Sequence, residues 1–134
     1  MVKRAHPTNA ELTRARAEAE ASMLDACLVL RRSATGQDAA TGMPIEAWVP
    51  VGDVVPCDVT IRSRRETHGT AQILVTTVSG RLPLRVDLTS LDRICVTQKL
   101  GFPLAVSETY EIVELKPGGL EWLVELKRPE TLEG

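Results

Sequence analysis

The apolar and polar positions of this chain first repeat with the period of a helix. After Pro7, either Thr8 or Asn9 can cap free backbone amides, and helical spacing continues to about Leu24. One narrow face is apolar and consists of Leu12, Ala15, Ala19, Met23 and Ala26. Alanine buries little area, so this face adds little to a core. We expect the helix either to pack on its own domain or to dock on a neighbouring subunit.

From Ala26 onward the period becomes two, which is typical of β-strands. The stretch 73–78 is apolar on both faces apart from two threonines, which predicts a central strand or one covered by a partner. Polar loops are expected at 32–42 and 63–70, and Ser79-Gly80 is expected to close a tight hairpin. Strands are predicted at 26–31, 45–49, 57–61, 73–78, 82–88, 94–96, 110–115 and 120–127.

Residue usage shifts in the same direction. Ten of the 13 alanines lie in the first 40 residues, whereas 12 of the 14 valines lie after residue 40. The predicted fold is mainly β: a small antiparallel β-barrel or sandwich of about seven to eight strands, preceded by one N-terminal α-helix. The domain organisation expected is a flexible N-terminus at 1–7, the helix at 8–25, a β-barrel domain at 26–128 and a C-terminal tail at 129–134.

Composition places the chain among soluble globular domains. Its 134 residues are 43% apolar and 25% charged, which disfavours disordered and low-complexity classes. The longest stretch without a charge has 14 residues, from Thr67 to Gly80, and is too short for a membrane span. The basic start runs into a charged segment, so no secretory signal is expected.

Candidate catalytic chemistry is sparse. The sequence contains neither a glycine-rich phosphate loop nor a GxSxG or HExxH motif. Glu66 and His68 form a lone acid/base pair without a nucleophile or a metal site nearby in the sequence. Three cysteines at 27, 57 and 95 each fall in a predicted strand, which favours buried thiols in a reducing compartment. We predict no enzyme activity, no cofactor and no metal.

Charge is distributed in blocks of alternating sign. The net charge is +2 over residues 1–32, −4 over 33–61, +4 over 62–99 and −4 over 100–134, which together give −2. Four aromatic residues are too few for a barrel that grips single strands by stacking. Contact with phosphates without base readout stays possible for the segment Arg62-Ser63-Arg64-Arg65. Blocks of opposite sign also suit head-to-tail self-association.

The order of these elements resembles a family of phage proteins. The segments that carry the resemblance are Leu28-Val29-Leu30-Arg31-Arg32, Thr41-Gly42, Pro56-Cys57-Asp58-Val59, Leu82-Pro83-Leu84, Leu91-Asp92-Arg93-Ile94-Cys95-Val96-Thr97 and Tyr110-Glu111-Ile112-Val113. Over roughly residues 8–128, the chain is similar to the head-to-tail connector proteins of long-tailed bacteriophages and prophages, especially those of actinobacterial hosts. This group includes the head-completion or stopper proteins.

The resemblance implies a virion protein that assembles as a ring, commonly a hexamer, in the neck of the particle after synthesis in the host cytoplasm. Its partners would be copies of itself, a portal or adaptor protein, a tail-terminator or tail-tube protein, and genomic DNA that passes through the lumen without sequence readout. No membrane is implied. The candidate channel loop comprises Arg62, Ser63, Arg64, Arg65, Glu66, Thr67, His68 and Gly69. Candidate contacts between subunits or rings are Leu12, Ala15, Ala19, Met23, Asp38 and Thr41, the last two in the loop 33–42.

Other functions stay open at this point. A tail-terminator or minor tail protein has a related size and also forms rings. From other classes, the sequence is compatible with a monomeric small barrel that binds nucleic acid or another ligand, and with an uncharacterised enzyme.

Overall fold

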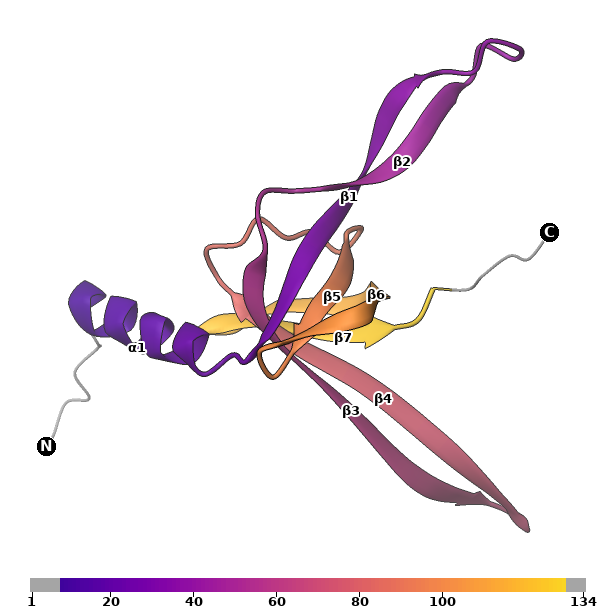
Figure 1. The fold of residues 1–134 in the computed structure, drawn as a ribbon. Helices are drawn as coiled ribbons and strands as arrows, with labels where there is room; N and C mark the ends of the chain where they lie inside the picture. Colours follow the sequence, from indigo (N-terminus) through magenta and orange to yellow (C-terminus); the bar gives the residue numbers. More distant parts are fainter. Residues whose placement is uncertain (1–7, 130–134) are drawn as a thin grey trace, which may run out of the picture.

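A computed structural model describes residues 8–129 of the chain, which form one helix and seven strands (Figure 1). The predicted flexible N-terminus at 1–7 and residues 130–134 of the predicted tail lie outside the described residues. The elements are α1 (Asn9–Ala21), β1 (Asp25–Gln37), β2 (Pro44–Pro50), β3 (Val55–His68), β4 (Ala71–Pro83), β5 (Arg93–Lys99), β6 (Phe102–Pro117) and β7 (Glu121–Lys127).

Six of the strands close into an antiparallel ring. The sheet order is β2-β1-β3-β4-β7-β6-β5, and β1 also pairs with β5, which joins the two ends of the sequence β1-β3-β4-β7-β6-β5. Strand β1 makes this closure possible because its parts have different partners: residues 25–27 pair with β3, 26–30 with β5, and 30–37 with β2. The predicted mainly β fold with one N-terminal helix is therefore confirmed, and the pairing selects a barrel over a sandwich.

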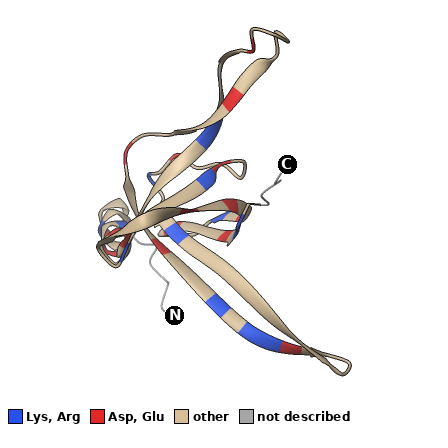
Figure 2. Ribbon diagram, turned by 45° about the vertical axis from the view of Figure 1, so that its right-hand side comes forward, with Lys and Arg blue, Asp and Glu red and all other residues tan. Residues whose placement is uncertain are grey.

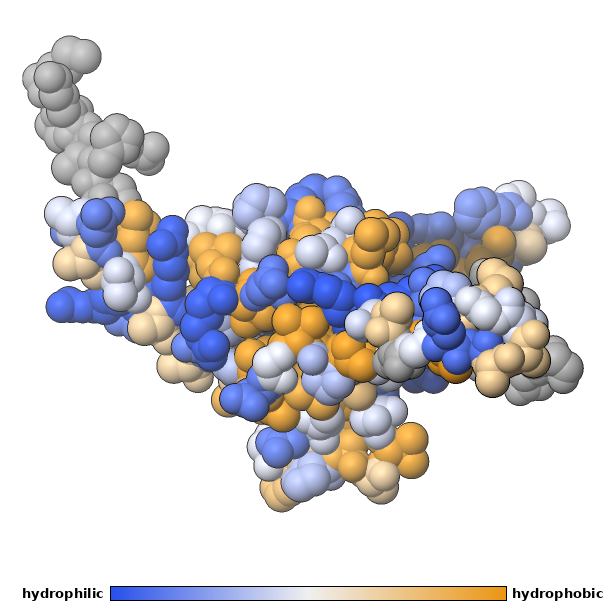
Figure 3. All heavy atoms as spheres, turned by 90° about the horizontal axis from the view of Figure 1, so that it is seen from above, coloured by the Kyte–Doolittle hydropathy of each residue, from blue (hydrophilic) through white to orange (hydrophobic). Residues whose placement is uncertain are grey.

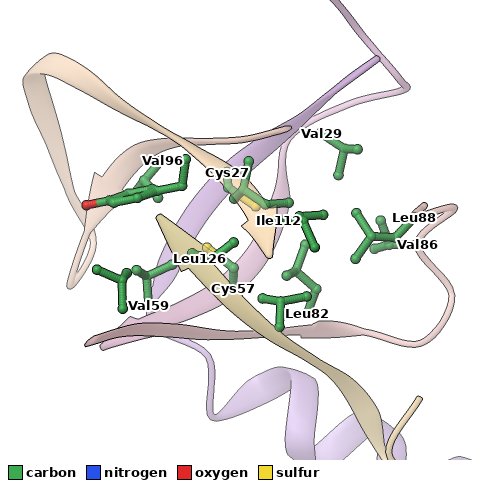
Figure 4. Packing of buried hydrophobic residues seen from close by; sticks show 14 residues of the cluster. Cys27, Val29, Cys57, Val59, Leu82, Val86, Leu88, Val96, Ile112 and Leu126 are labelled. Atoms are coloured by element: carbon green, nitrogen blue, oxygen red, sulfur yellow. The ribbon is translucent and has the colours of Figure 1, made fainter. Parts of the chain in front are cut away.

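The barrel interior is filled by the apolar positions of the period-two pattern (Figure 4). Two of the three cysteines, Cys27 and Cys57, are fully buried free thiols, and Cys95 is partly buried. A hydrogen bond with Cys57, together with burial, raises the pKa of the Cys27 thiol far above its ordinary value, so this thiol stays protonated. The core consists of Cys27, Val29, Cys57, Val59, Val78, Leu82, Val86, Leu88, Ile94, Val96, Tyr110, Ile112, Val124 and Leu126.

Helix α1 is shorter than predicted. The Thr8 side chain accepts a hydrogen bond from the Glu11 backbone amide, and the Glu11 carboxylate accepts one from the Thr8 backbone amide. This capping box selects Thr8 over Asn9, the other cap that the sequence allows. The helix ends at Ala21 rather than at 25, because strand β1 begins its pairing at Asp25. None of its residues is fully buried, and it contacts its own barrel through Arg16 and Glu20.

Both predicted loops are wrong, because strands continue through them. Strand β1 runs to Gln37 and pairs with β2, so most of 32–42 is extended. Strand β3 runs to His68 and pairs with β4 residue by residue, which leaves only Gly69 and Thr70 as a turn between the strands. Both faces of these segments are exposed to solvent, so their sequences lack the alternation of apolar and polar residues that predicts a strand. This is why the sequence predicts loops.

The predicted hairpin at Ser79-Gly80 and the strand at 82–88 are also wrong. Strand β4 continues through Gly80, which pairs with Val59 on one side and Val124 on the other. A Cβ atom at Gly80 would lie 3.0 Å from the Val124 side chain, so glycine here serves close packing and not a turn. The chain leaves the sheet after Pro83, and the connection 84–92 packs Val86 and Leu88 onto the barrel core without strand pairing, whereas Leu91 is exposed.

Candidate assembly interface

Two antiparallel arms extend from the barrel in different directions (Figure 1). We name them the β1–β2 arm, residues 31–49, and the β3–β4 arm, residues 62–77. In the β3–β4 arm the strands pair only with each other, since the pairing of β4 with β7 is confined to residues 78–83. Strand β2 lies at the sheet edge, as its flanking prolines Pro44 and Pro50 predict.

The β3–β4 arm is exposed on both faces. Within residues 62–77 only Glu66 and Val75 are half-buried, whereas Ile73 and Leu74 are 46% and 64% exposed. The apolar stretch 73–78 is therefore not a central strand, and only Val78 at its end reaches the core. Figure 3 shows apolar side chains reaching the molecular surface beside strongly hydrophilic ones. The alternative expectation, that a partner covers this stretch, stays a prediction.

Arginines alternate with apolar side chains across this arm. The register places Arg64 opposite Val75 and Arg65 opposite Leu74, on successive positions that point to opposite faces. Arg64 pairs with Glu66 at 2.5 Å. Figure 2 shows the basic segments along the arm and one acidic segment near its tip. Both faces of the arm therefore present a positive charge next to an apolar side chain.

All eight residues of the predicted channel loop lie in or next to this arm. Residues 62–68 belong to β3 and Gly69 begins the turn with a φ of 65°, a value that suits the first central residue of a type II′ hairpin. His68 lies 3.2 Å from Glu66, so the lone acid/base pair of the sequence sits near an exposed arm tip. The structure thus brings the predicted residues together as an extended arm rather than as a loop.

The six predicted contact residues are distributed over three places. Leu12, Ala15 and Ala19 are half-buried on α1. Asp38 and Thr41 lie at the exposed tip of the β1–β2 arm, where their side chains accept hydrogen bonds from nearby backbone amides at 2.8 and 3.3 Å. Met23 was expected on the helix face, but it follows the helix and is buried, so it does not contribute surface for a neighbour.

A buried carboxylate fixes the base of the β1–β2 arm. The Arg31 guanidinium donates to both oxygens of Asp92, at 3.0 and 2.9 Å, and to Asp87 at 3.1 Å. The Thr89 backbone amide donates to the same Asp92 carboxylate at 2.8 Å. Burial opposes ionisation of Asp92, but the hydrogen bonds from Arg31 and Thr89 outweigh it and hold the pKa of this carboxyl below its ordinary value. The arm is therefore anchored to the connection 84–92.

A second buried carboxylate, Asp25, ties β1 to the base of β3. Its oxygens accept hydrogen bonds from the backbone amides of Val59 and Leu100, both at 3.0 Å. Lys99 lies 3.5 Å from this carboxylate and donates to the Val59 carbonyl at 2.8 Å. Leu100 occupies the left-handed region with a φ of 50°, and the hydrogen bond from its backbone amide to Asp25 helps to hold it there.

Arg81 connects the base of the β3–β4 arm to the next strand of the barrel. Its guanidinium contacts Asp58 at 2.7 Å and Glu121 at 3.4 Å, so one cation links β3, β4 and β7. This contact and the two carboxylate anchors were missed by sequence reasoning. Apart from Thr89, which is three residues from Asp92, their partners are 23 to 75 residues apart and no local spacing connects them.

An acidic surface lies on the outer side of β6 and β7. We name the residues Glu114, Lys116, Leu123 and Glu125 the β6–β7 face. Together with Ser79, Gly80, Arg81 and Val124 they line a groove of about 380 Å³, in which Arg81 is paired with Asp58 and Glu121. The register places Glu114 directly opposite Glu125, and like charges in that position destabilise a sheet. Lys116 lies 3.2 Å from Glu114, whereas within residues 8–129 no cation forms an ion pair with Glu125. Leu123 is 43% exposed beside them.

Two further features bear on the chemistry of the described residues. In residues 8–129, no group of three or more His, Cys, Asp or Glu side chains is arranged to hold a metal ion. The single helix of this part of the chain lacks the length and apolar character that a bilayer crossing requires. The arrangement that the structure does present is a small barrel with two exposed arms and a separate acidic face.

Comparison with protein families, curated proteins and solved structures gives no match for this chain.

Proposed function

We propose that the chain is a structural subunit of a tailed-phage virion that forms a ring at the head-to-tail interface. There it would join the portal-adaptor complex to the tail and help to retain the packaged DNA. The observation that supports this proposal most is the β3–β4 arm, which is exposed on both faces and carries apolar and basic side chains.

The energetic argument starts from the arm itself. A two-stranded hairpin with both faces in water is marginally stable on its own. Exposed apolar residues such as Ile73 and Leu74 gain stability when a partner removes them from water, by about 25 cal/mol per Å² buried. A small barrel that extends such an arm is therefore suited to assembly, and repeated contacts between unlike surfaces close into a ring when the rotation permits.

The arginines of the arm are the features that suit a DNA channel. Arg62 and Arg65 have no acidic partner within residues 8–129, so their charges are available to phosphates. Phosphate contacts of this kind hold DNA without reading its sequence. Four aromatic residues in the whole chain leave little capacity for base stacking, which favours passage of duplex DNA over binding of single strands.

A trimmed arm tests the proposal in assembled particles. The native two-residue turn joins His68 and Ala71, and equivalent hydrogen-bonded pairs recur at every second position, so an Asn-Gly turn can join Arg62 to Thr77 in register. Phage particles built with this trimmed chain are expected to package DNA but to lose it or to fail to join tails. The matched control is the full-length chain with Arg62→Lys and Arg65→Lys, which keeps the charge and should give infectious particles.

Infectious, DNA-retaining particles from the trimmed chain would contradict the proposed role of the arm. The position of the chain in the particle, seen by electron microscopy of labelled virions, tests the rest of the proposal. Label at the neck supports the connector, whereas label at the far end of the tail tube supports a tail-terminator or minor tail protein. A chain absent from virions would favour the monomeric binding module.

A further inference from the structure

Two surfaces of the chain carry opposite charge together with exposed apolar side chains. One is the β3–β4 arm, where Arg62 and Arg65 have no acidic partner within residues 8–129 and Leu74 is exposed. The other is the β6–β7 face, where Glu125 has no basic partner in the described part of the chain and Leu123 is exposed. Each surface therefore offers the charge that the other lacks.

We propose that the β3–β4 arm of one copy lies across the β6–β7 face of a second copy of this chain. Arg65, which shares one face of the arm with Leu74, then approaches Glu125, while Leu74 covers Leu123. The contact is head-to-tail because the two surfaces differ, so it can repeat around a ring. This inference rests on the self-assembly included in the proposed function, and it names the surfaces that meet.

The β6–β7 face gains more from an incoming cation than an isolated carboxylate would. Glu114 and Glu125 are directly opposite each other in the register, and their mutual repulsion is relieved only on the Glu114 side, by Lys116 at 3.2 Å. An arginine from a second copy would neutralise the uncompensated charge. Its planar guanidinium can also donate to a carboxylate through two parallel hydrogen bonds, which fixes the orientation of the arm.

Within one chain, the outer part of the arm with Arg65 and Leu74 is held away from the β6–β7 face, whereas the groove beside Arg62 adjoins the groove of that face. The arm continues the β4 strand beyond the residues that pair with β7, and it extends away from the barrel (Figure 1). Arg81 holds the base of the arm through its contacts with Asp58 and Glu121, which opposes a hinge at that point. The arm therefore extends beyond its own barrel, and it can contact the β6–β7 face of another copy.

The apolar side chains distinguish a protein partner from nucleic acid. Leu74 and Ile73 lie opposite Arg65 and Glu66 in the register, so apolar groups alternate with charges along the arm. A phosphate backbone offers no apolar surface to match them, whereas the β6–β7 face presents Leu123 two residues from Glu125 on β7 and opposite Lys116 of β6. A second copy therefore matches the apolar side chains of the arm as well as its charge, whereas DNA would engage its arginines alone.

A charge exchange between the surfaces tests this inference. The arm variant carries Arg65→Glu, and the face variant carries Glu125→Arg. Each variant alone places like charges in contact, so its self-association, measured by sedimentation velocity at low ionic strength, should fall by at least about tenfold relative to the unmodified chain. An equimolar mixture of the two variants pairs opposite charges at every contact and should restore association.

The controls separate a specific contact from a general effect of charge. A variant with Arg14→Glu makes the same change in net charge as the arm variant, but on α1, and should associate like the unmodified chain. Leu74→Ser removes the apolar part of the contact and should weaken association without changing net charge. Circular dichroism verifies that each variant is folded.

Failure of this inference differs from failure of the proposed function. An unmodified chain that stays monomeric at high concentration and low salt, or a mixture that does not restore association, overturns the docking of the arm on the β6–β7 face. The same holds if the arm variant loses DNA binding while its self-association is unchanged. None of these results contradicts the proposed place of the chain in the virion neck. Conversely, absence of the chain from virions would contradict the proposed function but not the result of the charge exchange.

Discussion

At the scale of single residues, two buried carboxylates lie at the bases of the two arms. Asp92 and Asp25 are buried carboxylates, and each accepts at least two hydrogen bonds from parts of the chain that are distant in sequence. A buried charge is tolerated only when it is paired and hydrogen-bonded, so these residues fix one arrangement of strands and disfavour others.

The Asp92 anchor gives a matched pair of substitutions. Asp92→Asn removes the charge that Arg31 and Thr89 satisfy, and the free energy of unfolding is expected to fall by about 2–4 kcal/mol. Asp87→Asn alters the other acidic partner of the same arginine, but its side chain is 72% exposed, so the loss should stay below about 1 kcal/mol. Urea unfolding of both variants measures the difference. Equal losses would contradict the assignment of the buried partner as the anchor.

The pH dependence of stability follows from the same carboxyl. The folded pKa of Asp92 lies below its ordinary value, so its stabilising contribution is present above the unfolded pKa of about 3.9 and is lost as pH falls through the folded pKa. The difference in unfolding free energy between the unmodified chain and Asp92→Asn should therefore be constant near neutral pH and shrink below about pH 4. Unfolding curves at several pH values test this; a difference that grew on acidification would refute it.

Gly80 provides a test of packing at the junction of three strands. Gly80→Ala places a Cβ atom 3.0 Å from Val124 and 3.4 Å from the Asp58 carbonyl, and the expected cost is about 1–3 kcal/mol. Gly119→Ala is the control, because no atom lies within 4 Å of its added Cβ and its backbone is not in the left-handed region. Thermal unfolding compares the two. A neutral Gly80→Ala would mean that the β3, β4 and β7 strands have room to shift.

At the scale of elements, the barrel and the β3–β4 arm make separate contributions. Every residue of the core cluster lies outside residues 62–77, so the arm adds exposed surface and little core. The helix likewise has no fully buried residue; Leu12, Ala15 and Ala19 are half-buried, and hydrogen bonds from Arg16 to Gly119 and from Arg85 to Glu20 join the helix to the rest of the chain. The stability of the chain is therefore concentrated in the six-strand ring.

Trimming the arm at the Arg62–Thr77 pair is expected to leave the barrel intact. The free energy of unfolding should change by less than about 1 kcal/mol, since a two-stranded arm in water is marginally stable in any case. The control places the same Asn-Gly turn one pair farther out, between Ser63 and Thr76. Hydrogen-bonded and non-hydrogen-bonded pairs alternate along an antiparallel ladder, and this pair is non-hydrogen-bonded, whereas a two-residue turn requires a hydrogen-bonded pair. That variant should be the less stable of the two in urea unfolding. A trimmed chain that does not fold would show that the arm supports the barrel.

At the scale of the whole molecule, surfaces of opposite sign are separated on a body of low net charge. The net charge is −2, yet the segment that contains the β3–β4 arm is basic and the segment that contains the β6–β7 face is acidic. This separation favours attraction between copies in a defined orientation over uniform repulsion.

Assembly through such surfaces should depend strongly on salt. Raising the ionic strength from about 0.01 M to about 0.15 M shortens the screening length from roughly 30 to roughly 8 Å, so self-association should weaken progressively. Sedimentation velocity across this range measures the effect. The Leu74→Ser variant should keep the same slope with salt from a weaker starting point, and association that strengthens with salt would indicate a mainly apolar contact.

The sequence by itself determined the class of the fold and its inward-facing residues. The alanine-rich start predicts the helix, capped by Thr8 or Asn9, and the structure confirms the helix with Thr8 as its cap. Period-two alternation predicts the buried faces at Ile94, Val96, Val124 and Leu126, and the structure confirms all four. These features depend on local propensity and on a one-sided pattern of burial, both of which a sequence records directly.

Only the tertiary structure decided where strands end and which distant side chains meet. The arms were missed because a strand exposed on both faces has no apolar alternation, and Gly80 was taken for a turn because a glycine needed for close packing has the same local signature. The anchors at Asp25 and Asp92 depend on partners brought together by closure of the barrel. Such contacts are set by three-dimensional packing, which no local period encodes.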